Sequence, residues 1–283
     1  QWFAYLDLKY SLTEEDNISG VTKTRQLLQE GNKIPYPEVD DTLIVEKDKT
    51  HTRASALTIG KNIDDSSSLF FNFGLDINTI EKKVKGDSDI ISSSMSYFKV
   101  LDNHYISPYV YWNKPNYRRQ EDYQTLGAGI NNTFILNEKN NINYSIGYSN
   151  TLYEDNPTFD TANDNNNSVY SSSIRHNFNF TNKIQFGTKL ILNRSEYIKE
   201  FDSYDSKGVT LSYSHILPFG TLKLRSTYLE NDYDKIESFV SSTIIRKDES
   251  LVSVLSLDGQ LNKILPFTKK SKVDNSVFYT LNF

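Results

Sequence analysis

Apolar and polar residues alternate with a period of two along most of this chain, in segments of about ten residues. The clearest segment runs from Leu69 to Ile77, where every second residue is apolar and the residues between are mostly polar. Successive side chains of a β-strand point to opposite faces. Each segment therefore predicts a strand with one apolar and one polar face.

The connections between these segments are alternately short and long. Tight turns are expected at 64–66, 101–104, 137–140, 181–182 and 217–220, and longer polar loops at 83–89, 115–122, 156–167 and 202–206. Short turns at one end and long loops at the other are typical of outer-membrane barrels. With a strand at Phe239–Ile245 and two more strands between Glu249 and Phe283, the pattern predicts an all-β, transmembrane, antiparallel up-and-down β-barrel of about 14 strands, with 12 and 16 as alternatives.

The pattern continues without a linker, so residues 1–283 are predicted to form a single barrel domain. Its longest loop is the first, at about 13–48, in which 22–30 followed by Gly31 predicts a short helix with a glycine stop. No signal peptide opens the chain, and we expect a mature protein or a piece of a longer precursor.

The last stretch, Ser276–Phe283, is expected to close the barrel against the first strand at Trp2–Leu12. Its apolar face consists of Val277, Tyr279, Leu281 and Phe283. An uncovered amphipathic edge promotes aggregation, whereas a closed barrel has no edge. An edge strand of a soluble β-sandwich is the alternative.

Composition is compatible with such a barrel. The chain is 37% hydrophobic and has no apolar run near the roughly 20 residues of a membrane helix. It has 19 Tyr and 16 Phe, residues that form the aromatic girdles of outer-membrane barrels. The absence of Cys excludes disulfides and thiolate ligands, and a net charge of −5 argues against nucleic-acid binding.

Charged residues recur on the polar faces of the predicted strands. They are Asp7, Lys9, Asp76, Arg175, Lys189, Lys223 and Arg225. Unpaired charges are costly in a dry core, so we expect them to face a hydrated lumen. An open conduit and an interior filled by paired charges and water both fit this pattern.

Catalytic and metal motifs are missing from the sequence. The four histidines, His51, His104, His176 and His215, are scattered and lack the spacing of a metal-binding pair. We therefore predict no cofactor and no enzymatic activity.

Several short segments resemble the barrel of the surface lipoprotein assembly modulator (Slam) family. "YLDLKYSLTEEDNISG" is similar to its opening strand, "SKGVTLSYSHILPFGTLKLRSTYLENDYDK" to a strand, Leu-Pro-x-Gly turn and strand, and "IIRKDESLVSVLSL" to its Arg-x-Asp element. "ILPF" and "DNSVFYTLNF" resemble its last strand start and final loop. The positions that match the family are Asp16, Asn17, Arg246, Asp248, Pro266 and Ser276.

This resemblance implies a 14-stranded barrel in the bacterial outer membrane that helps move lipoproteins or secreted binding proteins to the cell surface. The expected partners are outer-membrane lipid, that protein substrate and the barrel-assembly machinery. In the family a periplasmic tetratricopeptide-repeat domain precedes the barrel, and this chain has no helical repeats. A porin-like passive channel for small polar solutes is the alternative function.

Overall fold

The computed structural model describes residues 1–16, 26–29, 32–35, 47–81, 87–117, 122–155, 161–237, 243–260 and 278–282. Within them, 13 strands form one antiparallel sheet, and two more form a separate hairpin. The sheet consists, in spatial order, of β1 (Trp2–Asp16), β4 (Lys47–Asp64), β5 (Ser67–Ile80), β6 (Ser88–Leu101), β7 (His104–Tyr117), β8 (Tyr123–Asn137), β9 (Asn140–Tyr153), β10 (Asn167–Thr181), β11 (Ile184–Tyr197), β12 (Tyr204–Leu217), β13 (Gly220–Tyr233), β14 (Lys247–Gln260) and β15 (Phe278–Asn282).

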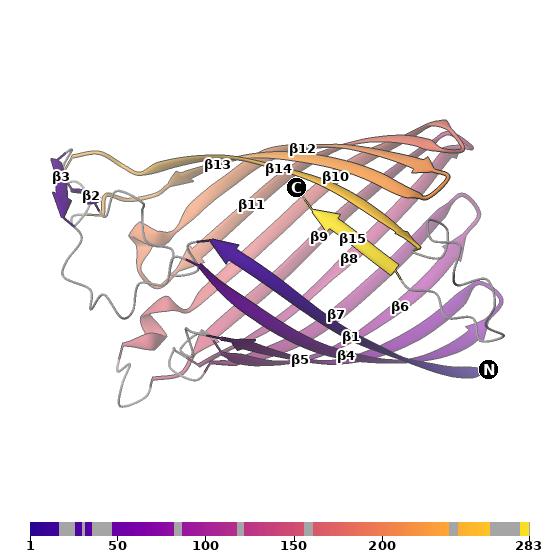
Figure 1. Ribbon diagram of the computed structural model, residues 1–283, viewed down its shortest axis with the longest axis horizontal. Helices are drawn as coiled ribbons and strands as arrows, with labels where there is room; N and C mark the ends of the chain where they lie inside the picture. The colour runs from indigo at the N-terminus through magenta and orange to yellow at the C-terminus, as the bar shows by residue number, and fades with distance from the viewer. Residues whose placement is uncertain are drawn as a thin grey trace.

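Every strand of this sheet pairs with the next one along the chain, so the topology is up-and-down. Figure 1 shows the sheet curling, with β1 and β15 near the viewer and the middle strands behind them. Within the described residues, β1 pairs with β4 and β15 pairs with β14. Closure between the first and last strands therefore remains a prediction, as does the count of 14.

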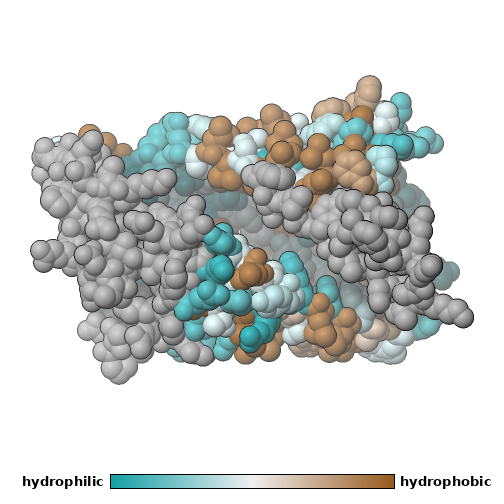
Figure 2. Space-filling model, in the orientation of Figure 1, coloured by the Kyte–Doolittle hydropathy of each residue, from teal (hydrophilic) through white to brown (hydrophobic). Residues whose placement is uncertain are grey.

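The register carries the alternation of the sequence across the whole sheet. Leu6, Leu57 and Phe73 lie side by side on β1, β4 and β5, and Leu224 lies beside Leu255 on β13 and β14. These residues belong to the apolar face, whose side chains are largely exposed, up to 72% for Leu251 of β14. Figure 2 shows such apolar side chains on the surface along the top and bottom of the molecule.

Contacts that skip a strand show that the polar face is the concave one. The Arg175 guanidinium of β10 reaches the Ser212 hydroxyl of β12, and Phe3 of β1 lies 6.0 Å from Phe70 of β5, between ring centroids. A glycine on the strand between makes room in each case, Gly187 and Gly60. Side chains converge in this way on the inside of a curled sheet, so the apolar face is convex.

Two sequence predictions about local structure fail in the parts of their ranges that the structure describes. Of the helix expected at 22–30, the described part is the strand β2 (Gln26–Gln29), which pairs with β3 (Asn32–Pro35) and places Leu27 opposite Ile34. A helix this short is marginal without packing, whereas strand pairing satisfies backbone groups locally. The strand expected at 239–245 is absent from its described part, residues 243–245, and the last long strand begins at Lys247.

Short 3₁₀ helices, Ala162–Asn165 and Glu200–Asp202, complete the described structure. No helix among these residues is long and apolar enough to cross a membrane.

Candidate functional site

The polar face is a wall of hydrogen-bonded side chains. The Thr58 hydroxyl donates to Asn72 at 2.7 Å, and the Asn72 amide donates to Ser94 at 3.1 Å, which links β4, β5 and β6. Ser145 and Ser173 make a similar link between β9 and β10. The wall thus satisfies many of its own polar groups, as expected where water also has access.

An apolar core is nearly absent from the described residues. Their buried apolar side chains are Ile80 and Ala162, whereas several hydroxyl-bearing side chains are buried. A soluble sandwich of this size buries apolar side chains from both of its sheets. Most of the exposed apolar side chains of the described sheet instead lie on the convex surface.

All seven residues expected to face a lumen lie on the concave polar face. Asp7 lies opposite Ala56, and Lys9 and Asp76 flank Ala54 across β1, β4 and β5. The other four lie on β10–β13, at Arg175, Lys189, Lys223 and Arg225. The structure therefore separates them into a mixed group on one side of the sheet and a basic group on the other.

Three members of the basic group share a hollow that we call the inner cationic cavity. It has a volume of about 380 Å³ and is lined by Arg175, Lys223 and Arg225 together with Gln185, Ser212 and Ser256. Arg175 donates from Nη2 to Ser212 Oγ at 2.9 Å, and Ser212 lies directly opposite Arg225 in the register. Ser212 therefore contacts Arg175 and lies next to Arg225 on the neighbouring strand.

One carboxylate lies next to this cavity. Lys223 Nζ is 2.7 Å from Asp258 Oδ2 of β14. The sequence analysis did not single out Asp258. Its alternation with Leu255 and Leu257 could have placed it on the polar face, but the pairing with Lys223 depends on the β13–β14 register.

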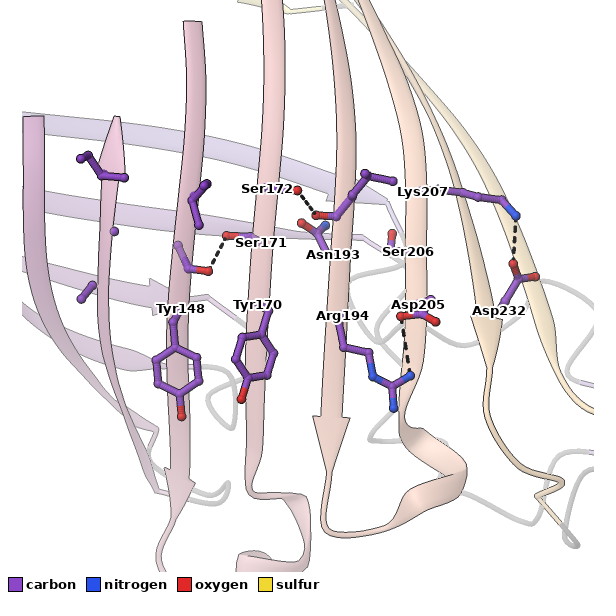
Figure 3. A pocket seen from close by; sticks show the side chains of 16 residues that line it. Tyr148, Tyr170, Ser171, Ser172, Asn193, Arg194, Asp205, Ser206, Lys207 and Asp232 are labelled. Atoms are coloured by element: carbon purple, nitrogen blue, oxygen red, sulfur yellow. Dashed lines mark hydrogen bonds and ion pairs between the residues drawn. The ribbon is translucent and has the colours of Figure 1, made fainter. Parts of the chain in front are cut away.

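A second hollow lies on the convex face. This outer groove of about 850 Å³ is lined by the apolar side chains Ile130, Ile146, Tyr148, Tyr170 and Leu192. Figure 3 shows the rings of Tyr148 and Tyr170 pointing the same way from neighbouring strands, with centroids 5.1 Å apart. No single segment of the sequence indicates this groove, because the residues that line it come from six strands, β8 to β13.

Charged residues border the outer groove at the end of the strands nearest the long loops. Arg194 is turned toward Asp205, and Lys207 toward Asp232, as Figure 3 shows. Lys207 and Lys247 both lie 2.8 Å from Glu230. We call these residues the charged belt: Arg194, Asp205, Lys207, Glu230, Asp232 and Lys247. The belt lies on the convex face of β11–β14, between the apolar part of that face and the long loops.

The belt continues into the segment after β13. Arg194 Nη1 donates to Asp234 Oδ1 at 2.7 Å. This hydrogen bond lowers the pKa of the Asp234 carboxyl from its ordinary value.

The Arg-x-Asp element suggested by the family resemblance forms an ion pair just before and within β14. Arg246 Nη2 lies 2.6 Å from Asp248 Oδ2, and its guanidinium lies over the Tyr233 ring at 4.6 Å. Hydrogen bonding to Asp248 raises the pKa of Arg246. The element thus fastens the start of β14 to β13.

The remaining family and closure positions are described less fully. Asp16 lies opposite Lys47, Tyr279 opposite Gly259, and Leu281 opposite Leu257. Asn17, Pro266, Ser276, Val277 and Phe283 lie outside the described residues. In the part of the chain that is described, no three His, Cys, Asp or Glu residues are grouped to hold a metal ion.

No protein-family model and no curated protein sequence matches this chain. Among the solved structures that match, the copper transporter OprC is 12% identical with a TM-score of 0.49, over 90% of this chain and 47% of OprC. This chain therefore spans about half the length of OprC. Two structures of OmpT, an outer membrane protein of Vibrio cholerae, are 7% and 8% identical, with TM-scores of 0.41 and 0.36. They match over 88% of this chain and over 96% and 95% of their own chains. Because each of these three TM-scores lies below 0.5, these likenesses support no argument about function.

The prediction that the chain is not an enzyme needs correction. It depended on missing motifs alone, which do not exclude an activity, and beside the matches to OmpT the enzyme status is not established. We assign no catalytic residue, and the proposals below do not depend on the presence or absence of catalysis.

Proposed function

We propose that this chain forms a closed β-barrel in the outer membrane of a Gram-negative bacterium. The observation that carries the proposal is the segregation of the two faces, with exposed apolar side chains on the convex face and charged or hydrogen-bonded ones on the concave face. Lipid covers the first face, and the second encloses a hydrated interior.

The proposed membrane position follows from the lengths of the strands. Strands such as β13 and β14 have 14 residues, whereas a tilted barrel strand needs about 9–11 to cross the hydrocarbon layer. The extra residues carry the charged belt, which lies above the apolar band on the side of the long loops. Cell fractionation followed by protease treatment of intact cells tests this. Cleavage confined to the long loops supports the proposal, and recovery of the chain in the soluble fraction overturns it.

We further propose that the barrel moves lipoproteins or secreted binding proteins to the cell surface, with the barrel-assembly machinery inserting it in the membrane. The resemblance to the Slam family supports this cargo. We place the route to be tested at the seam between β14 and β15, the last pairing of the described sheet.

Surface display of a lipoprotein tests the translocation proposal. We expect cells that express the chain to expose a co-expressed lipoprotein to antibody, as measured by flow cytometry. Because the chain has no cysteine, a disulfide can be introduced with no competing thiol. The pair Leu257→Cys and Leu281→Cys joins neighbours in the β14–β15 register.

The seam-locked variant should lose display and regain it on reduction. The matched control joins β12 and β13, through Leu211→Cys and Ser226→Cys, and should display the lipoprotein normally. Display that persists in the locked variant would contradict opening at this seam. No display by the unmodified chain would contradict the translocation function itself.

A passive channel for small polar solutes is the second candidate, and the inner cationic cavity favours it. Conductance across a planar bilayer distinguishes the two. A steady pore of large conductance, whose ion selectivity changes in Lys223→Glu and Arg225→Glu, favours the channel and overturns the translocator. Absence of a steady current through the unmodified barrel and through both variants favours the translocator.

A further inference from the structure

The inner cationic cavity has more positive charge than the described residues neutralise. Arg175, Lys223 and Arg225 line it, and Lys189 lies next to Arg175 in the β10–β11 register. Against these four cations, Asp258 supplies one carboxylate, which pairs with Lys223. Arg225 and Lys189 make no hydrogen bond or ion pair with any residue that the structure describes.

Arg175 contributes a second, independent observation. Its Nη2 is bound to Ser212, but its Nε is buried and has no hydrogen-bond partner among the described residues. Buried polar groups are nearly always satisfied, so an unpaired donor on a charged group requires an explanation. Gly187 leaves room for the Arg175 side chain to take this position. A Cβ added to Gly187 would lie 2.5 Å from Ser212 Oγ and 3.2 Å from Arg175 Nε.

The register places these cations on the same part of the concave wall, within four residues along the strands. Ser212 lies opposite both Gly187 and Arg225, and Ser214 lies opposite Lys223. Gln185, Ser212 and Ser256 add neutral donors to the lining of the cavity. Guanidinium groups with neighbouring hydroxyl and amide donors are the typical surroundings of a phosphate or carboxylate.

We propose that the inner cationic cavity binds a compact oxyanion, a phosphate or carboxylate group of a solute or cargo that enters the barrel. The inference depends on the proposed function in one respect, namely that the concave face is hydrated. Arg225 and Arg175 donate to the anion, and Lys223 contributes its charge while Asp258 holds it in place. The wall that bears Asp7 and Asp76 has no comparable excess of cations.

Titration of the refolded full chain with inorganic phosphate tests the proposal. We expect calorimetry in detergent micelles at neutral pH and low salt to show saturable binding. Arg225→Gln should weaken it by about tenfold or more, because one charge-assisted hydrogen bond is lost. Arg225→Lys should restore part of the affinity.

The matched control is Lys9→Gln, which removes one cation from the other side of the concave wall. It should bind phosphate as the unmodified chain does, and circular dichroism should show that all variants fold alike. Absence of saturable binding, equal binding by Arg225→Gln, or an equal loss in Lys9→Gln overturns the inference.

The result is separable from the test of translocation. A barrel that displays lipoprotein but binds no phosphate overturns the oxyanion site alone. A barrel that binds phosphate but displays no lipoprotein overturns the translocation proposal alone.

Discussion

Leu224→Arg places a cation on the convex face of β13, between two residues that are already cationic on the concave face. Leu224 is 42% exposed and lies beside Tyr213 and Leu255 on the apolar face. Its neighbours in sequence, Lys223 and Arg225, line the inner cationic cavity. The same chemical group is therefore native to one side of the strand and foreign to the other.

The size of the effect distinguishes lipid from water on the convex face. Along β13 that face is apolar from Leu222 to Tyr228, apart from Ser226, so Leu224 lies near the middle of the apolar band. Arg on the lipid face near the bilayer midplane costs about 2–4 kcal/mol. In water, an exposed substitution away from any special contact changes stability by about 0.5 kcal/mol or less.

Urea unfolding of the barrel in lipid vesicles measures this difference. Trp2 and Trp112 are the two tryptophans of the chain and report the transition by fluorescence. We expect the free energy of unfolding of Leu224→Arg to fall by about 2–4 kcal/mol, with the slope against urea unchanged.

Val252→Arg is the matched control on the neighbouring strand. Val252 is 59% exposed and lies opposite Thr227 on the concave face, which we propose to be hydrated. Its substitution should change the free energy of unfolding by about 0.5 kcal/mol or less. Equal effects of the two substitutions, or a neutral Leu224→Arg, would refute the assignment of the faces.

Two further predictions concern close packing on the concave wall and the pH dependence of the charged belt. Gly129→Ala should lower the free energy of unfolding by about 1–3 kcal/mol, because the added Cβ would lie 2.6 Å from Tyr109 Oη and from a backbone oxygen. Adding Tyr109→Phe to this variant removes only the first contact, so it should recover little of the lost stability. Full recovery would contradict a clash with the backbone. Asp234→Asn should destabilise by less than about 1 kcal/mol at pH 7, because the ion pair with Arg194 is partly exposed. The pKa of Asp234 is lowered in the folded protein, so this contribution is complete above the unfolded value of about 3.9 and is lost as the pH falls through the folded value. The difference between Asp234→Asn and the unmodified chain, measured by urea unfolding, should therefore shrink steadily as the pH falls below about 3.9. A difference that stays constant on acidification would contradict the proposed pair.

The period-two alternation was sufficient to predict most of the sheet. Segments such as 69–77 became strands with the expected faces, because strand geometry fixes the direction of every second side chain. The alternation did not identify the β2–β3 hairpin, where a short run fits a helix or a strand equally well. It also predicted a strand at 239–245 that is not present in the described part, 243–245, where the next long strand begins only at Lys247.

For the candidate sites too, the sequence predicted the face on which each residue lies but not which residues come together. The sequence placed Lys223 and Arg225 on a polar face, because that depends on parity along one strand. The cavity they form with Arg175 depends on the register of four neighbouring strands, and Arg175 reaches Ser212 because Gly187 leaves space on the strand between.

The sequence by itself determined which residues share a face of each strand, and with it the separation of charged from apolar positions. The tertiary structure decided which strands are neighbours, which face is concave, and which of the scattered cations meet. Parity is a local property of the backbone, whereas register and curl depend on contacts between residues distant in the sequence. For this reason the basic residues could be found by alternation, but the site they form could be found only after the sheet was assembled.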